Sequence, residues 1–130
     1  MVVMATATRV PVINGAALSP GCTLISNTPE ELDLESVRRA DRIVTTSTEE
    51  VETHVPPFQA IYDLVQSGEL PRQGAYDDIA DIVVGRKPGR RSDDEIIVCV
   101  NPGSGVHDVA VARFVYQRAL DLGLGTDLPT

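Results

Sequence analysis

The sequence predicts a single α/β domain built on a parallel sheet of about four strands with flanking helices. Short runs of apolar and β-branched residues alternate with segments of helical spacing, a pattern typical of strands and helices around a parallel sheet. The run EIIVCV, residues 95–100, is apolar after its first residue and indicates a strand buried on both faces. The length of 130 residues suits one domain, and the 42% hydrophobic content allows a buried core.

Strands are expected at residues 2–8, 22–26, 42–47 and 95–100. The first two are separated by turn signals, including Asn14-Gly15 and Pro20-Gly21. The core must be aliphatic, because the chain has two Phe, three Tyr and no Trp.

Two helices are expected from signals at their N-termini. Residues 28–40 have Pro29 near the start and acidic residues in the first turn, which the helix dipole favours. Ser47–Glu50 fits a capping box, so a short helix is expected there that stops before Pro56-Pro57.

Three more helices are expected from spacing and stop signals, at residues 58–68, 75–85 and 105–122. Gly68 and Gly85 end the first two, and Gly123 and Gly125 follow the third. The apolar faces predicted for the first two consist of Phe58, Ile61, Leu64 and Val65, and of Ile79, Ile82 and Val83.

The net charge of −8 argues against nucleic acid and anionic membranes as partners, because both would repel the chain. One basic cluster, Arg86, Lys87, Arg90 and Arg91, is expected to be a solvated loop. Cys22 and Cys99 lie in apolar runs and are expected to be buried free thiols. With no leader pattern and no long apolar run, we expect a cytoplasmic protein.

Several charged residues invite a functional interpretation that the sequence does not favour. The acidic clusters Glu49, Glu50 and Glu52, and Asp77, Asp78 and Asp81, are expected on solvated helix faces. His54 has no second His or Cys at metal-ligand spacing, so no metal site is expected.

A strand, a glycine-rich turn and a helix follow one another between residues 95 and 122, which is the outline of a nucleotide site. The run GSGVHD is no full G-x-G-x-x-G fingerprint, however, because Asp108 stands at the third glycine position.

The run VVGRKPGRRSDDEIIVCVNPGSGVHDVAVARFVYQRALDLGLGT resembles the C-terminal part of the ornithine cyclodeaminase/mu-crystallin family. The earlier runs ATATRVPVINGAALSPGCTLIS and ELDLESVRRADRIVTTS resemble the segments that precede it in that family. The resemblance therefore covers essentially all 130 residues. It implies that residues 1–130 form the C-terminal part of a Rossmann-like NAD(P)-binding domain, a partial Rossmann-like sheet.

The same resemblance implies that the family's substrate and dimerisation domain, and its G-x-G-x-x-G unit, are not in this sequence. The last helix and tail are expected to pack toward that missing domain. The implied cofactor is NAD or NADP, and the implied substrate is a small-molecule amino acid or imine. The implied partner is a second copy, giving a homodimer, or a complementing N-terminal chain, and the isolated chain is expected to be inactive.

Three residues are candidates for cofactor binding by resemblance. Thr8 falls where the family places a Thr or Ser beside the cofactor, and the alternative is a hydroxyl that caps its own turn. Asn101 and Gly103 lie in a turn near the nicotinamide in the family, and the alternative is a turn that needs them for geometry alone. Asp108 is expected to favour the dipole of the last helix, and His107 to be a neutral surface residue.

No residue is expected to be catalytic. Ornithine cyclodeaminases have a GGD turn whose Asp is the proposed acid/base, and this chain has Ser26-Asn27 in the equivalent turn. Members of the ketimine reductase and amino-acid dehydrogenase types also lack that Asp. Two other functions stay open: a non-catalytic half-domain that binds a partner, and, less favoured, an unrelated receiver-like domain.

Overall fold

The computed structural model describes residues 1–49, 59–71, 75–126 and 128, and it confirms the parallel α/β class. Five parallel strands pair in the order β1-β2-β5-β3-β4. Their bounds are Val2–Met4 for β1, Thr23–Ser26 for β2, Arg42–Thr45 for β3, Tyr76–Asp78 for β4 and Ile97–Val100 for β5. The four expected strands are present, and each is shorter than its expected range. Strand β4 is a fifth strand that was not expected.

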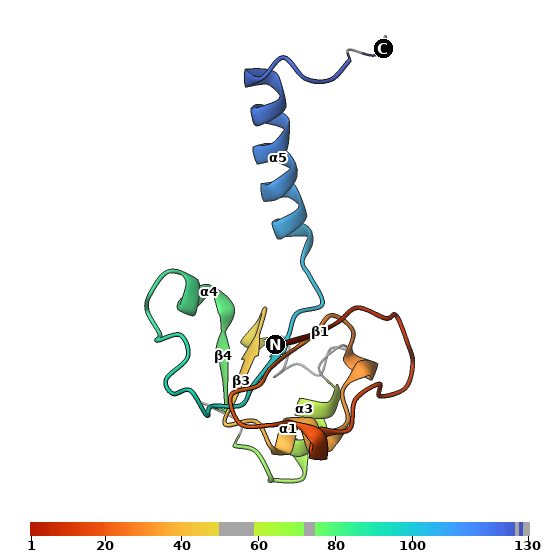
Figure 1. Ribbon diagram of the computed structural model, residues 1–130, viewed down its shortest axis with the longest axis vertical. Coiled ribbons are helices and arrows are strands. Elements are labelled where there is room, and N and C mark those ends of the chain that lie inside the picture. The colour runs from red at the N-terminus through yellow and green to blue at the C-terminus, as the bar shows by residue number, and fades with distance from the viewer. Residues whose placement is uncertain (50–58, 72–74, 127, 129–130) are drawn as a thin grey trace.

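One face of the sheet carries the core. Leu24, Val98, Ile43 and Tyr76 lie in one row across β2, β5, β3 and β4, and all are buried. Helices α1 (Leu34–Arg38) and α3 (Gln59–Gln66) and the short 3₁₀ helices η1 (Gly15–Ala17) and η2 (Pro29–Glu31) lie over this face (Figure 1). Val37, Ile61 and Leu64 of these helices and Leu32 between η2 and α1 are buried, so the core is aliphatic as expected.

The segment expected to be one helix at 28–40 is divided in two. Leu32 has an extended backbone between η2 and α1. Asp33 then caps α1 by accepting a hydrogen bond from the backbone nitrogen of Ser36 at 2.7 Å and one from the nitrogen of Gly15 at 3.0 Å. The hydrogen bond from Gly15 joins η1 to α1 through Asp33, the residue that caps α1. Asp33 could not serve as this cap if η2 and α1 were one continuous helix.

The segment expected to be a helix at 75–85 begins as a strand. Tyr76 pairs with Ile43, and the side chain of Asp78 then accepts from the nitrogen of Ala80 to start α4 (Ile79–Val83). The expected apolar face forms only in part, because Ile79 and Ile82 are half-buried but Val83 is 79% exposed.

Helix α5 (Gly105–Asp121) stands away from the sheet and its covering helices, as Figure 1 shows. Its bounds agree with the expected helix, and Gly123 and Gly125 follow with φ angles of 62° and 108°. Within the described residues, every helix is too short or too polar to cross a membrane. The helix expected from the capping box at Ser47–Glu50 begins as expected, since residues 48 and 49 are helical and Glu49 is exposed. Its continuation, with Glu50, Glu52, His54 and Phe58, falls at residues 50–58, outside the described residues.

Candidate functional site

The carboxyl ends of the parallel strands form one edge of the sheet, and ligands in open α/β sheets bind beyond this edge. The chain leaves β2 at Asn27, whose nitrogen donates to the carbonyl of Met4 at the end of β1. It leaves β5 at Asn101, whose nitrogen donates to the carbonyl of Ser26 at 2.8 Å. The turns after β1, β2 and β5 are thereby linked along one edge.

A buried carboxylate, Glu31, organises this edge. One of its oxygens accepts hydrogen bonds from the backbone nitrogen and the hydroxyl of Thr6, at 2.5 and 2.8 Å. The other accepts from the hydroxyl of Ser26 at 3.1 Å and from the backbone nitrogens of Asn27 and Thr28 at 3.3 and 3.2 Å. The Glu31 side chain therefore joins the turns that follow β1 and β2.

The ionisation of Glu31 follows from these contacts. Burial opposes the charged form, but the hydrogen bonds from Thr6, Thr28 and Ser26 outweigh it and lower the pKa from 4.5 to about 2. A carboxylate that is 0% exposed and has five donors is a poor proton carrier near neutral pH. We therefore assign Glu31 a structural role at this edge of the sheet and no role in acid/base chemistry.

Thr8 lies in the turn that Glu31 holds. The residue before it, Ala7, has a φ of 52°, a left-handed conformation that is uncommon outside glycine. The Thr8 hydroxyl accepts a hydrogen bond from the nitrogen of Val10 at 3.3 Å, so the turn-capping alternative for Thr8 is observed. Its half-buried side chain also lies on the carboxyl side of β1, where the resemblance places a cofactor contact.

Asn101 and Gly103 lie in the turn between β5 and α5. Asn101 is half-buried and directly follows Val100, the last residue of β5. Gly103 has a φ of 86°, and a Cβ added there would meet no atom within 4 Å. The topology therefore places all three candidates on one edge, with β2 between the strands that carry Thr8 and Asn101.

Three buried hydroxyls on the strand ends have no hydrogen-bond partner in the described part of the chain. They belong to Thr28 after β2, Thr45 at the end of β3 and Thr46 beyond it. Buried polar groups normally have partners, and these three hydroxyls are exceptions whose oxygens are shielded from the surface of this edge. No motif in the sequence distinguishes these three threonines from others.

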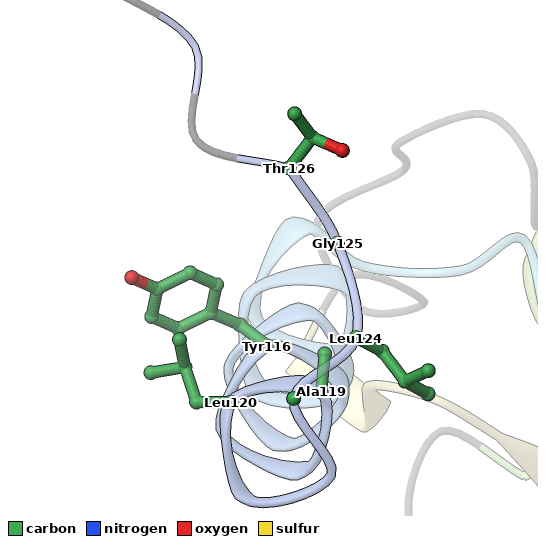
Figure 2. Close-up of a pocket in the computed structure, with 7 residues that line it drawn as sticks. Tyr116, Ala119, Leu120, Leu124, Gly125 and Thr126 are labelled. Atoms are coloured by element: carbon green, nitrogen blue, oxygen red, sulfur yellow. The ribbon is translucent and has the colours of Figure 1, made fainter.

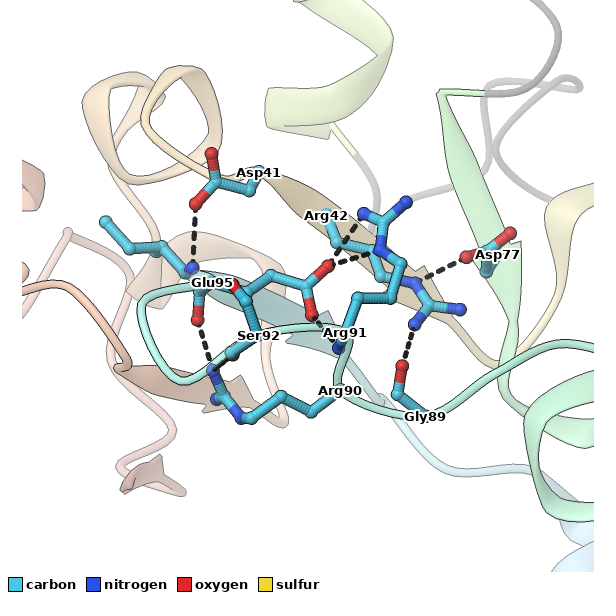
Figure 3. A network of polar contacts seen from close by, with 9 residues as sticks. Asp41, Arg42, Asp77, Gly89, Arg90, Arg91, Ser92 and Glu95 are labelled. Atoms are coloured by element: carbon cyan, nitrogen blue, oxygen red, sulfur yellow. Dashed lines mark hydrogen bonds and ion pairs between the residues drawn. The ribbon is translucent and has the colours of Figure 1, made fainter.

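The opposite edge of the sheet holds a network of ion pairs (Figure 3), where one expectation is incomplete and another is wrong. The basic cluster is exposed as expected, with side-chain exposures of 74% for Arg86 and 55% for Arg91, but it is also paired. Arg90 donates to the hydroxyl of Thr23 and to the carbonyl of Glu95, and Arg91 pairs with the carboxylate of Glu95 at 2.7 Å. Burial opposes ionisation of Glu95, but the bonds from Arg91 lower its pKa. The loop is fixed by charges that the sequence alone does not pair.

Asp77 is likewise no solvated carboxylate. It pairs with the buried Arg42 at 2.6 Å and with Lys87 at 2.6 Å, and Arg42 also donates to the carbonyl of Gly89. Burial raises the pKa of Asp77, and the hydrogen bonds from Lys87 and Arg42 reverse this and lower it. Because this network lies at the starting ends of β2, β3 and β5, we assign it a structural role.

The remaining expectations concern α5 and the thiols. Asp108 lies in the first turn of α5, where the dipole favours a carboxylate, and His107 beside it is exposed. Cys22 is half-buried and Cys99 buried, and both are free. Burial raises the pKa of the Cys99 thiol.

The sheet order, the parallel strands and the polar turns at their carboxyl ends define an α/β fold of the kind that binds nucleotides at this edge. The profile of the ornithine cyclodeaminase/mu-crystallin family matches residues 1–123, and the chain belongs to this family. The structure thus confirms the family and the Rossmann-like sheet that the sequence predicts.

Three known proteins illustrate the relationship. The structure of Thermococcus litoralis Δ¹-pyrroline-2-carboxylate reductase in complex with NADH and L-proline is 29% identical, with a TM-score of 0.80 over 97% of this chain and 39% of that one. An archaeal alanine dehydrogenase dimer with bound NAD is 28% identical, with a TM-score of 0.71 over 98% and 40%. N-((2S)-2-amino-2-carboxyethyl)-L-glutamate dehydrogenase of Staphylococcus aureus is 27% identical over 98% of this chain and 37% of its own length. The chain therefore spans about two fifths of the length of these relatives.

Proposed function

We propose that this chain is the C-terminal, nicotinamide-side half of an NAD(P)-binding domain in an oxidoreductase that acts on an amino acid or its imine. The observation that carries the proposal is the match of 97% of the chain, including its carboxyl edge, to a reductase with bound NADH and L-proline. The cofactor would supply or accept a hydride at the α-carbon of the substrate. The proposal includes a cytoplasmic location, which two free thiols support.

The residues of the carboxyl edge fit such a cofactor. The open space over Gly103 allows a ring or ribose to approach the backbone closely. The half-buried Asn101 has a side-chain amide that can bond a carboxamide or ribose hydroxyl. Thr8, in the turn that Glu31 holds, would contact the cofactor from the side opposite to Asn101 and Gly103.

The pyrophosphate must be bound by a segment outside these 130 residues, since they contain no G-x-G-x-x-G run. A second copy of the same sequence would lack that run too. The proposed activity therefore requires a segment that carries such a run in addition to these 130 residues.

The reaction type follows from the turn after β2. Cyclodeamination of ornithine requires a group that carries protons at the amine and the imine, but Ser26-Asn27 offers no carboxylate. Glu31 is buried and saturated with donors. Loss of a positioned acid/base costs about 10²–10⁴ in rate, whereas a bound iminium can arrive already protonated. Imine reduction or amino-acid oxidation is the reaction that this edge supports.

The test is a reconstituted protein made by joining this chain to the unmatched part of a relative. Assays would compare NAD(P)H-dependent reduction of a cyclic imine with release of proline from ornithine. We expect imine reduction with little proline release. Rapid proline release without imine reduction would contradict the assignment.

A non-catalytic half-domain is the second candidate, and the observation that favours it is that these 130 residues contain no G-x-G-x-x-G run. The same reconstitution separates the two functions. A complex that binds NADH and turns over no imine or amino acid would support the binding module.

A further inference from the structure

Arg9 lies in the turn after β1, directly after the cofactor candidate Thr8, and its side chain is exposed. Its guanidinium has no hydrogen bond or ion pair with any residue that the structure describes. An arginine side chain carries several N–H donors and no acceptor, so it is available to an anion. The other described arginine and lysine side chains of residues 1–100 all have acceptors: Arg38, Arg39, Arg42, Arg86, Lys87, Arg90 and Arg91.

The loop after β1 that carries this arginine is held at both ends by Glu31. The carboxylate accepts from the backbone nitrogen and the hydroxyl of Thr6 at 2.5 and 2.8 Å, and the backbone carbonyl of Glu31 accepts from the nitrogen of Val12 at 3.1 Å. Between these points Ala7 has a φ of 52°, and Pro11 fixes its own φ and restricts the residue before it. A loop held in this way loses little conformational entropy when a ligand binds to it.

Strain in the same loop is a second reason to look for a ligand there. The left-handed conformation of Ala7 is costly for a residue with a Cβ, and such residues persist where the surrounding structure holds them in place. They are frequent at ligand sites. Ala7 is followed directly by Thr8 and Arg9, so the strained residue sets the direction in which the chain presents both side chains.

An anionic ligand at the carboxyl edge needs a cation nearby. The chain has a net charge of −8, and its field repels phosphates and carboxylates. A guanidinium next to Thr8 offsets this repulsion where the proposed cofactor binds. Its planar set of donors also matches both oxygens of a carboxylate, or two oxygens of one phosphate.

Hollows elsewhere in the described residues suit an anion less well. Figure 2 shows a groove of 420 Å³ at the end of α5, whose lining is uncharged: Tyr116, Ala119, Leu120 and residues 123–126. A hollow of 340 Å³ at the starting ends of β3 and β5 includes Arg91, but Arg91 already pairs with Glu95. Asp41 and Asp94 line the same hollow and would repel an anion.

We propose that Arg9 binds an oxyanion at the carboxyl edge and helps to determine which ligands this edge accepts. The inference rests on the proposed function for the identity of the ligand. Two groups can supply the oxyanion: the ribose phosphate of the nicotinamide nucleotide, and the carboxylate of the amino acid or imine. The position of Arg9 beside Thr8, a candidate for cofactor binding, favours the phosphate.

The test is a titration of the isotope-labelled chain, followed by nuclear magnetic resonance at the Nε–H group of Arg9 and the backbone amide of Thr8. The probes are inorganic phosphate, reduced nicotinamide mononucleotide, reduced nicotinamide riboside, which lacks the phosphate, and L-proline. We expect the mononucleotide to bind about fivefold more tightly than the riboside, the upper range for an exposed ion pair. Arg9→Ala should remove this preference. Arg9→Lys should restore part of it, because lysine keeps the charge and loses the planar set of donors.

The matched control is Arg113→Ala. Arg113 is an exposed arginine on α5 without a partner among the described residues, so the control changes the net charge by the same amount. It should leave every affinity within about twofold, since charges far apart are screened by salt. Circular dichroism shows that each variant is folded. Equal losses in Arg9→Ala and Arg113→Ala would overturn the proposal, and so would an Arg9 signal that no probe shifts.

The same titrations separate the two sources of the oxyanion. A loss in Arg9→Ala that is confined to the mononucleotide assigns the phosphate, and a loss confined to L-proline assigns the carboxylate. Inorganic phosphate that shifts the Arg9 signal, while neither nicotinamide probe binds, would support the oxyanion site and contradict the proposed function. A preference for the mononucleotide that Arg9→Ala leaves unchanged would overturn the role of Arg9 and leave the proposed function intact.

Discussion

The carboxylate of Glu31 contacts both the backbone nitrogen and the hydroxyl of Thr6, 25 residues earlier in the chain. The contact joins η2 to the turn after β1, and it fixes the backbone next to Ala7, which is in a left-handed conformation. The shape of the proposed cofactor edge therefore depends on one buried charge.

We expect Glu31→Gln to destabilise the chain by about 2–4 kcal/mol. The substitution replaces an oxygen that accepts hydrogen bonds with an amide group that donates, which faces backbone nitrogens that also donate. Urea unfolding followed by circular dichroism measures the change. Glu30→Gln is the control, since Glu30 is exposed, and it should change stability by less than about 0.5 kcal/mol.

The lowered pKa of Glu31 predicts the acid sensitivity of the fold. The folded state holds the proton less tightly than the unfolded state, so the stabilisation is complete above pH 4.5 and is lost as the pH falls toward 2. The loss should be roughly 3 kcal/mol, from 1.36 kcal/mol for each unit of pKa. Unfolding free energies measured between pH 6 and pH 2 check this, and Glu31→Gln should flatten that part of the profile. An unchanged profile in the variant would assign the acid sensitivity to other groups.

The sequence predicts most of the sheet because its strands are apolar runs. It does not reveal β4, since Tyr76–Asp78 is short and two of its residues are acidic. Only pairing with β3 makes that segment a strand. Likewise, the sequence predicts which residues form α5, but it does not predict that α5 stands away from the sheet. An apolar pattern indicates that a helix is buried, and it does not identify the surface against which the helix packs.

The site is predicted in part for the same reason. Thr8 ends one predicted strand, and Asn101 and Gly103 follow another, so their edge can be inferred from the order of the elements. Glu31 could have been found from the spacing of Thr28 and Glu31, which fits a capping box. Its bonds to Thr6 and Ser26 depend on the fold, and so does the pairing of Arg42 with Asp77.

The buried ion pair of Arg42 and Asp77 should be important for stability. Asp77→Asn leaves the guanidinium, which has a side-chain exposure of 6%, without its carboxylate partner. We expect a loss of about 3 kcal/mol in the free energy of unfolding. Asp81→Asn breaks the exposed pair with Arg86 instead and should cost less than about 1 kcal/mol. Equal effects of the two variants in urea unfolding would show that Arg42 is not dependent on Asp77.

Gly15 marks the closest approach between η1 and α1. A Cβ at this position would lie 2.2 Å from the backbone nitrogen of Ser36, and the backbone cannot move aside as a side chain can. Gly15→Ala should therefore separate η1 from α1 and cost about 1–3 kcal/mol. Gly89→Ala meets no atom within 4 Å and should be neutral within about 0.5 kcal/mol. Thermal unfolding of the two variants beside the unmodified chain provides the comparison.

The last prediction concerns which half of the dinucleotide this chain binds. A dinucleotide domain consists of two mononucleotide-binding halves, and the 130 residues contain no G-x-G-x-x-G run for the pyrophosphate. The isolated chain should therefore bind NADH weakly, with a dissociation constant of about 1 mM or higher. If Asn101, Gly103 and Thr8 form the nicotinamide side, reduced nicotinamide mononucleotide should bind about as well as NADH, and AMP should bind more weakly.

Asn101→Ala should weaken the binding of NADH and of the nicotinamide nucleotide about fivefold, the loss expected for one hydrogen bond. Titrations followed by nuclear magnetic resonance can measure such weak affinities. Low-micromolar affinity for NADH, or preference for AMP, would show that the chain contains a different part of the site.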